Sequence, residues 1–280
     1  MKLPMYASEW FGIDLTALPA AKRRDRKPAD PELFAQFYEK LAQGHGQIDH
    51  KFIAERRAEA RAISAEIFSA WWKQHGRAPR ILSLAVGTAV CEEIWLAEGY
   101  DVTLQECQEA SLQDLLSRFP NAPRLIGDIR DISIDALYDV VCMLGLDTTL
   151  ACDELITLFR RIADLLSADG LLLVDCRANL SFRHLITELA KRALGRYQPT
   201  THIMWGWWRT PGALRALAHT AGMQLKAAYR LVCDGKGEMK ICRRQQLLQA
   251  VPTLRDSMVM LALMYCGGER SIRVNWRDST

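Results

Sequence analysis

Residues 80–106 read RILSLAVGTAVCEEIWLAEGYDVTLQE. Residues 81–86 form a short apolar run without proline, which is typical of a strand buried on both faces, as in a parallel sheet. A turn at Gly87 breaks this run, and apolar residues at helical spacing follow it. Residues 102–104 indicate a second strand, which ends at Glu106. This order predicts half of a doubly wound nucleotide-binding sheet, with the ligand across the carboxyl ends of the strands.

The composition favours one large domain, or one domain with appendages. The chain has 280 residues, of which 49% are hydrophobic, and this content is ample for a buried core. The net charge is +3 and the sequence pI is about 8.4. Nucleic-acid-binding domains usually carry a much stronger basic surface, so we expect no nucleic-acid partner.

The cysteines and the apolar runs indicate a cytoplasmic protein. None of the eight cysteines belongs to a CxxC pair or to a Cys/His ligand spacing, so we expect reduced thiols and no metal site. The N-terminal segment carries acids and lacks an apolar core, unlike a signal peptide. The longest apolar run, residues 258–266, is far shorter than the roughly 20 residues of a membrane span, so we expect no membrane partner.

The alternation of strands and helices continues beyond residue 106. Helical patterns separate further apolar strands, which are predicted at residues 124–126, 138–144, 171–174 and 224–232. Residues 234–237, DGKG, are a hairpin signal, and they predict a final strand over residues 238–242. The sequence thus predicts an α/β fold with a doubly wound, mostly parallel seven-stranded sheet whose last strand is antiparallel.

The two ends of the chain are interpreted as additions to this α/β domain. Residues 1–77 are interpreted as an irregular and helical leader, in which a helix follows Asp30 and a longer one spans residues 48–73. Residues 245–280 are interpreted as a helical appendage to the domain at residues 78–244. Its helix is apolar all round, so it must be buried against the leader or against a second subunit of a homodimer.

The middle part resembles the class I S-adenosylmethionine-dependent methyltransferases. Ser83 takes the acidic position of their first motif, and Ala85, Gly87 and Ala89 take the positions of its three glycines. Further likenesses are YDVV at residues 138–141, LLSADGLLLVD at 165–175 and RTPGALRALAHTAG at 209–222. The likeness covers residues 80–244 and depends on the order of these segments, because only one of the three glycines is present.

This resemblance implies S-adenosylmethionine as the cofactor. It implies that Glu106 binds the ribose and that Asp128, in the Gly-Asp-apolar element, accepts a hydrogen bond from the adenine amino group. It also implies that Tyr38 of FYEKLA touches the cofactor, although ordinary packing explains that tyrosine equally well. The full set of implied cofactor-binding residues is Tyr38, Ser83, Ala85, Gly87, Glu106, Cys107, Asp128, Ile129 and Leu144.

Residues 195–212, GRYQPTTHIMWGWWRTPG, are predicted to roof the pocket of a small-molecule acceptor. Their tryptophans form either an aromatic wall for a planar or cationic acceptor or a packed lid. Histidine titrates near neutral pH, so His202 is the preferred general base. Tyr197 in the same segment and His184 in the preceding helix are the other candidate catalytic residues.

The sequence supports methyl transfer to an oxygen or nitrogen of a small molecule, and two alternatives stay open. The missing glycines are also typical of an inactive methyltransferase-like protein that serves as a binding or assembly module. A third reading is an enzyme that uses S-adenosylmethionine to transfer a group other than methyl. Failure to bind the cofactor would favour the inactive module.

Overall fold

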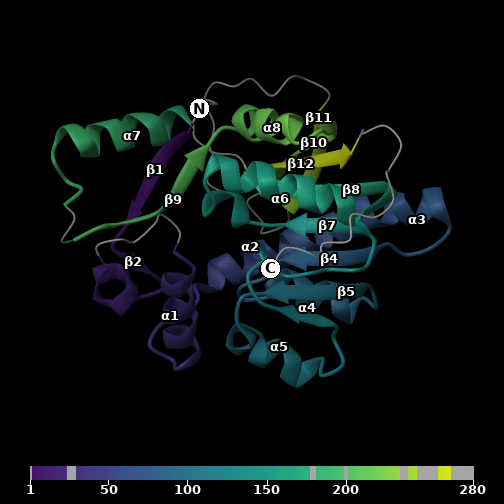
Figure 1. Ribbon diagram of the computed structural model, residues 1–280, viewed down its shortest axis with the longest axis horizontal. Helices are drawn as coiled ribbons and strands as arrows, with labels where there is room; N and C mark the ends of the chain where they lie inside the picture. The colour runs from purple at the N-terminus through teal and green to yellow at the C-terminus, as the bar shows by residue number, and fades with distance from the viewer. Residues whose placement is uncertain are drawn as a thin grey trace, which may run out of the picture.

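The computed structural model describes residues 2–23, 30–176, 181–198, 201–233, 239–244 and 258–265. Within these residues the main sheet has eight strands (Figure 1), in the order β11 (Met239–Arg244), β10 (Met223–Cys233), β12 (Met258–Tyr265), β8 (Leu166–Cys176), β7 (Tyr138–Met143), β4 (Arg80–Leu84), β5 (Asp101–Glu106) and β6 (Arg124–Ile126). Strands β4 to β8 run parallel to one another. The predicted doubly wound, mostly parallel sheet is therefore confirmed.

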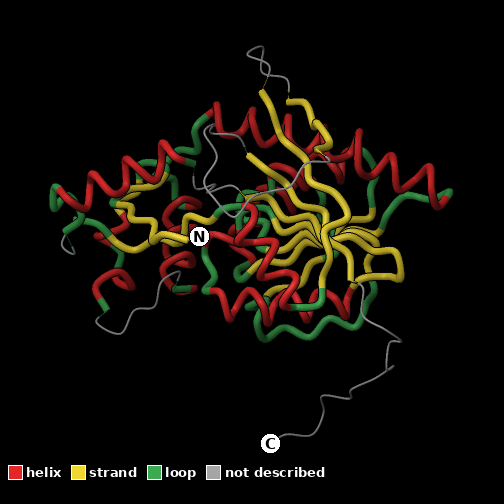
Figure 2. Tube along the Cα trace, turned by 90° about the horizontal axis from the view of Figure 1, so that it is seen from above, coloured by secondary structure: helices red, strands yellow, loops and turns green. Residues whose placement is uncertain are grey.

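Helices cover both faces of this sheet (Figure 2). One face packs against α6 (Cys152–Leu165) and α8 (Pro211–Thr220). The other packs against α2 (His50–Ile63), the π-helical turn η3 (Ser64–Phe68), α3 (Ser69–His75), α4 (Val90–Ala97) and α5 (Gln113–Arg118). Successive residues of a strand point to opposite faces, so Ile81 and Leu82 belong to different core clusters.

Strand β12 corrects the interpretation of the C-terminal part of the chain. The predicted helix is wrong for residues 258–265, which form a strand between β8 and β10 and antiparallel to both. Leu261 and Leu263 pack on one face of the sheet and Met260 and Ala262 on the other. An uninterrupted apolar run fits a buried helix or a strand buried on both faces, and its short length should have favoured the strand.

The expected seven-stranded arrangement is contained in this sheet. It runs from β6 to β10, and β12 is its antiparallel strand. The last strand predicted from the sequence corresponds to β11, which pairs antiparallel with β10 and adds an eighth strand at the edge. The hairpin signal at residues 234–237 lies outside the described residues. The predicted homodimer interface also loses its basis, because the described part of the apolar segment is internal to the sheet.

The first residues of the chain build a small unit beside the main sheet, on the left of Figure 1. The prediction of irregular structure is wrong for residues 2–7, because β1 (Lys2–Ala7) pairs antiparallel with β9 (Ile203–Arg209). We call the N-terminal unit the set β1, β9, β2 (Glu9–Trp10), β3 (Ile13–Asp14), η1 (Leu15–Ala17), η2 (Pro19–Lys22) and α1 (Pro31–Ala42). It has its own core around Leu15, Leu33 and Phe37.

Helix α7 (Phe182–Ala193) lies along the N-terminal unit, and two 3-10 turns, η4 (Glu109–Leu112) and η5 (Leu146–Thr148), follow β5 and β7. An Arg192 guanidinium nitrogen donates a hydrogen bond to the Pro4 carbonyl at 3.0 Å.

No helix within the described residues is long and apolar enough to cross a membrane.

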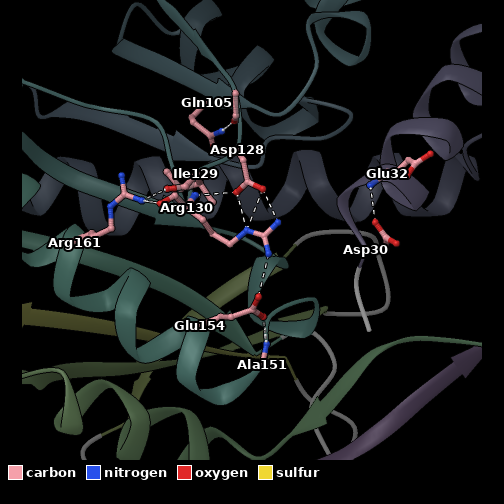
Figure 3. Close-up of polar contacts among 10 residues, drawn as sticks. Asp30, Glu32, Gln105, Asp128, Ile129, Arg130, Ala151, Glu154 and Arg161 are labelled. Atoms are coloured by element: carbon pink, nitrogen blue, oxygen red, sulfur yellow. Dashed lines mark hydrogen bonds and ion pairs between the residues drawn. The ribbon is translucent and has the colours of Figure 1, made fainter. Parts of the chain in front are cut away.

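The helix starts follow the signals in the sequence. The Asp30 carboxylate accepts a hydrogen bond from the Glu32 amide at 3.1 Å, and proline occupies the first position of α1 (Figure 3). The long helix predicted over residues 48–73 is present as α2, η3 and α3, and Gly76, with φ of 69°, ends it in the left-handed conformation. Helices α1 and α2 both contribute residues to the cavity described below.

We expect Leu261→Ala to lower the free energy of unfolding by about 2–5 kcal/mol, because Leu261 is fully buried in the centre of the sheet. Urea denaturation followed by circular dichroism measures this loss. Leu189→Ala is the matched control, because Leu189 on α7 is 51% exposed, and its effect should stay within about 0.5 kcal/mol. Equal effects of the two substitutions would contradict the placement of β12.

Candidate active site

A cavity of about 520 Å³ lies between the carboxyl ends of the central strands and the N-terminal unit. The loops after β4, β5, β6 and β7 line one part of it, and β1, β2, α1 and β9 line the other. Ligands of doubly wound sheets bind at this edge of the strands, and the volume lies within the usual range of ligand pockets, about 300–1,000 Å³. We therefore take this cavity as the candidate active site.

The loop after β4 has kept the backbone shape of a glycine-rich turn. Ala85, Gly87 and Ala89 have φ values of 50°, 57° and 53°. Left-handed backbone is unfavourable for alanine by roughly 1–2 kcal/mol, because its Cβ approaches the following carbonyl oxygen. The three positions that the family resemblance gives to glycine thus all adopt the conformation that glycine favours.

Gly87 is the position at which a side chain has no room. A Cβ atom built on it would lie 2.5 Å from the Tyr38 hydroxyl oxygen. Tyr38 comes from α1 and lines the cavity, so this helix closes directly over the loop. Burial, and then the nearby Glu106 carboxylate, raise the pKa of Tyr38 well above its usual value, so the phenol stays protonated.

Glu106 occupies the end of β5 and lines the cavity. Its carboxylate accepts hydrogen bonds from the amides of Gly87 and Cys107, both at 2.7 Å. Burial raises the pKa of Glu106, and the two amide hydrogen bonds oppose this shift. The preceding residue, Gln105, accepts a hydrogen bond from the Ala85 amide and donates one to the Gly127 carbonyl at 2.7 Å.

Asp128 lies in the lining and is already paired (Figure 3). Its carboxylate accepts hydrogen bonds from the Arg130 guanidinium at 2.5–3.0 Å, and this pairing lowers the pKa of Asp128. Arg130 also donates to Glu154 at 3.0 Å. The sequence reasoning did not single out Arg130, and its only signal was a basic residue two positions after the aspartate.

The remaining implied cofactor residues divide into two groups. Cys107, Ile129 and Leu144 line the cavity. Ser83 does not, because it is buried beneath the loop and donates a hydrogen bond to Glu92 of α4 at 2.5 Å. Its hydroxyl therefore joins the first strand to the following helix, and the structure does not place it where a ligand would touch it.

Arg56 of α2 is a buried cation in the cavity wall that the sequence analysis did not identify. It pairs with Glu59 at 2.5 Å and lies 3.7 Å from Asp175. Burial raises the pKa of Glu59 to about 8 and that of Asp175 to about 7, and the Arg56 charge opposes both shifts. Asp175 also accepts a hydrogen bond from the Gly145 amide at 2.5 Å, so this network supports the loop after β7.

The three candidate catalytic residues, all described by the structure, are absent from the cavity lining. The Tyr197 hydroxyl donates to Glu188 at 2.5 Å, the His184 ring stacks on Trp208 at 4.5 Å, and His202 lies beside Thr201. The reason is that the predicted roofing loop is largely the strand β9. The register of β9 with β1 is irregular at Trp205, which has no partner in β1, and both Trp205 and Trp208 line the cavity.

Aromatic rings dominate the part of the cavity that the N-terminal unit lines. Trp10 packs edge-on against Trp205 with ring centroids 4.9 Å apart, and Phe34 contacts Trp205 at 4.5 Å. Phe11 stacks on Trp10 at 5.0 Å. All four rings line the cavity. Within the described residues, no group of three His, Cys, Asp or Glu side chains is arranged to hold a metal ion.

Several solved structures with a similar fold are methyltransferases. Mitomycin 7-O-methyltransferase MmcR superposes with a TM-score of 0.52 at 16% identity, over 85% of this chain and 58% of that chain. Magnesium protoporphyrin IX methyltransferase (ChlM) from Synechocystis PCC 6803, solved with bound S-adenosylhomocysteine, superposes with a TM-score of 0.51 at 12% identity, over 83% of this chain and 94% of that chain. This chain has the class I S-adenosylmethionine-dependent methyltransferase fold.

The methyltransferase fold is thus shared at low sequence identity. The chain spans only 58% of the length of MmcR, the first of these relatives. It spans 90% of the CcbJ methyltransferase from Streptomyces caelestis, with a TM-score of 0.50 and 16% identity. No protein-family model matches the sequence, and no curated protein sequence matches it.

We expect Ala89→Gly to raise the free energy of unfolding by up to about 1 kcal/mol, because glycine adopts the left-handed conformation of residue 89 without the steric cost of a Cβ atom. Ala54→Gly, at an exposed position within α2, is the control and should lower it by about 1 kcal/mol. Urea denaturation measures both changes. A loss of stability in Ala89→Gly as large as in the control would contradict the left-handed loop.

Asp147 is a buried carboxyl group whose ionisation makes the stability of the fold depend on pH. It follows β7, is fully buried, and its carboxylate oxygens meet no hydrogen-bond donor in the described structure. Burial raises the pKa of Asp147 to about 7, while the Arg209 guanidinium and, more weakly, the nearby Thr148 amide oppose the shift. The unfolded chain has the ordinary pKa of about 3.9. Between these two values the folded state binds the proton more tightly, so stability falls as pH rises from about 4 to 7.

We therefore expect Asp147→Asn to stabilise the fold by about 1–3 kcal/mol at pH 8 and to change it little at pH 4, where the carboxyl is neutral in both states. Urea denaturation at the two pH values checks this difference. Asp135→Asn, at an exposed loop position, is the control and should show no such pH dependence. A penalty at pH 8 for Asp147→Asn would mean that the carboxylate is stabilised by its surroundings.

Proposed function

We propose that this protein is an S-adenosylmethionine-dependent methyltransferase that acts on an oxygen or nitrogen of a small-molecule acceptor. The observation that carries this proposal is the loop after β4. Its three left-handed residues bring the Gly87 and Ala85 backbone to the cavity wall, directly beside the Glu106 carboxylate. A backbone that is strained at two alanines persists only where its surroundings fix it, and such strain gathers at ligand sites.

The residues present fit the proposed cofactor. Glu106 offers carboxylate oxygens at the strand end where the family resemblance places the ribose hydroxyls. Gly87 has no side chain, and the Tyr38 hydroxyl lies where its Cβ would be, so only glycine lets α1 close over this loop. Ile129 and Leu144 supply apolar surface on the two neighbouring loops, and Asp128 supplies an acceptor beside Arg130.

In this proposal the protein binds the cofactor and the acceptor and orients them, because methyl transfer is a displacement at carbon that depends on the alignment of the two molecules. S-adenosylmethionine, when bound, would supply an electrophilic methyl group to the acceptor lone pair, with its sulfur leaving as a thioether and the acceptor proton passing to solvent. Tyr38, protonated and packed on Gly87, closes the site over the loop. Arg56 fixes the loop after β7 through Asp175.

The cavity also bears on the alternative of an inactive binding module. That alternative supposes that the alanines at positions 85 and 89 have closed the ligand site. Instead, Ala85 lines an open cavity and Ala89 keeps the glycine-like backbone. These observations support the cofactor-binding proposal, and they leave the nature of the transferred group to experiment.

Calorimetric titration of the purified protein with S-adenosylhomocysteine tests the proposal. We expect binding that Glu106→Gln weakens by about 1–3 kcal/mol, because the substitution removes a charged acceptor from a buried site. Glu98→Gln, at an exposed position after α4, is the control and should leave the affinity unchanged. A folded wild-type protein that does not bind S-adenosylhomocysteine would overturn the proposal.

A further inference from the structure

The two parts of the cavity differ in charge. The part formed by the main sheet and α2 carries Arg56, Glu106, Asp128 and Arg130, and the Arg56 charge is already paired with Glu59 at 2.5 Å. In the N-terminal unit, the described lining residues include a single charged side chain, that of Glu9, and it is exposed. A charged ligand group placed among these rings would lose its hydration without gaining a partner, which is strongly unfavourable.

The rings of the N-terminal unit form a connected group that reaches the cofactor loop. Trp205 contacts Trp10 at 4.9 Å, Trp10 stacks on Phe37 at 4.8 Å, and Phe37 contacts Tyr38 edge-on at 5.2 Å. The Tyr38 hydroxyl lies against Gly87. Trp10, Trp205 and Gly87 line the same cavity, so a flat molecule that lies on these two rings would share the cavity with the proposed methyl donor.

Polar groups for orientation come from the loop after β7. Thr148 and Thr149 line the cavity, and their hydroxyls donate to the carbonyls of Gly145 and Leu146, both at 2.9 Å. Each hydroxyl oxygen keeps lone pairs that accept a hydrogen bond. The backbone of Gly206 in β9 packs on this loop so closely that a Cβ atom would lie 2.4 Å from the Thr148 carbonyl oxygen.

We propose that the acceptor is an uncharged, planar aromatic molecule that carries a hydroxyl or amine, held on the rings of Trp10, Phe34 and Trp205. Rings in stacked or edge-on contact attract one another beyond the apolar area that they bury. The threonine oxygens receive the O–H or N–H of the acceptor. This inference rests on the proposed function and names the class of substrate for the same site.

The test is calorimetric titration of the protein, saturated with S-adenosylhomocysteine, with three probes of one shape. The probes are 2-naphthol, its saturated analogue decahydro-2-naphthol, and the anion naphthalene-2-sulfonate. We expect 2-naphthol to bind about tenfold more tightly than the saturated analogue, because only the aromatic probe gains ring contacts. The sulfonate should bind more weakly still, because its charge finds no partner.

Two substitutions locate the site. Trp205→Leu and Phe34→Leu each keep an apolar side chain and remove a ring, so each should weaken 2-naphthol binding by about tenfold and leave the affinity for S-adenosylhomocysteine within about twofold. Trp205 is buried and Phe34 is half-buried. If Trp205→Leu does not fold, the result with Phe34→Leu tests the site. Trp72→Leu is the control, because Trp72 of α3 is 55% exposed and outside the cavity lining.

The outcomes separate this inference from the proposed function. Equal affinities for 2-naphthol and its saturated analogue, or unchanged 2-naphthol binding in Phe34→Leu, would overturn the aromatic acceptor while S-adenosylhomocysteine binding stands. Tight binding of the sulfonate would overturn the uncharged class. A titration without the probes measures S-adenosylhomocysteine binding. No binding in that titration would overturn the proposed function.

Discussion

Two consecutive side chains of β5 hold the candidate active site together. Gln105 joins the Ala85 amide to the Gly127 carbonyl, and so it links the loops after β4 and β6. Glu106 accepts hydrogen bonds from the amides of Gly87 and Cys107. Buried amides left without acceptors would be unfavourable, so these side chains stabilise a left-handed backbone that two alanines would otherwise avoid. The loop therefore keeps its shape through side chains of the neighbouring strand.

The N-terminal unit completes the site from a distant part of the chain. Strand β1 pairs with β9, about two hundred residues later, and α1 brings Tyr38 against Gly87. The unit has a separate hydrophobic core, with Leu15, Leu33 and Phe37 fully buried. The aromatic rings that line the cavity are therefore supported by a packed core. Such rigid support is what an aromatic binding surface requires to hold a ligand in a defined orientation. The polar loops of the main sheet and this unit contribute different chemistry to one cavity.

Much of the fold was predictable because local patterns and tertiary environment agree. The strand at residues 81–86 and the caps at Asp30 and Gly76 were read from the sequence alone. Strand β12 was not predicted, because an apolar run that is buried on both faces shows no alternation of polar and apolar residues. Only its pairing with β8 and β10 identifies it as a strand. The strand pairing of residues 2–7 likewise depends on a long-range partner, β9. Its formation was not predicted, and neither was the position of His202 and Tyr197 outside the cavity lining.

The position of β12 has a consequence for synthesis of the chain. Strands β8 and β10 do not pair with each other, so each presents an open edge until β12 has entered between them. Open edges of apolar strands readily pair with other chains, and contacts between segments far apart in sequence form slowly. Nascent chains that have made β10 but not yet residues 258–265 therefore expose two strand edges that the folded protein covers.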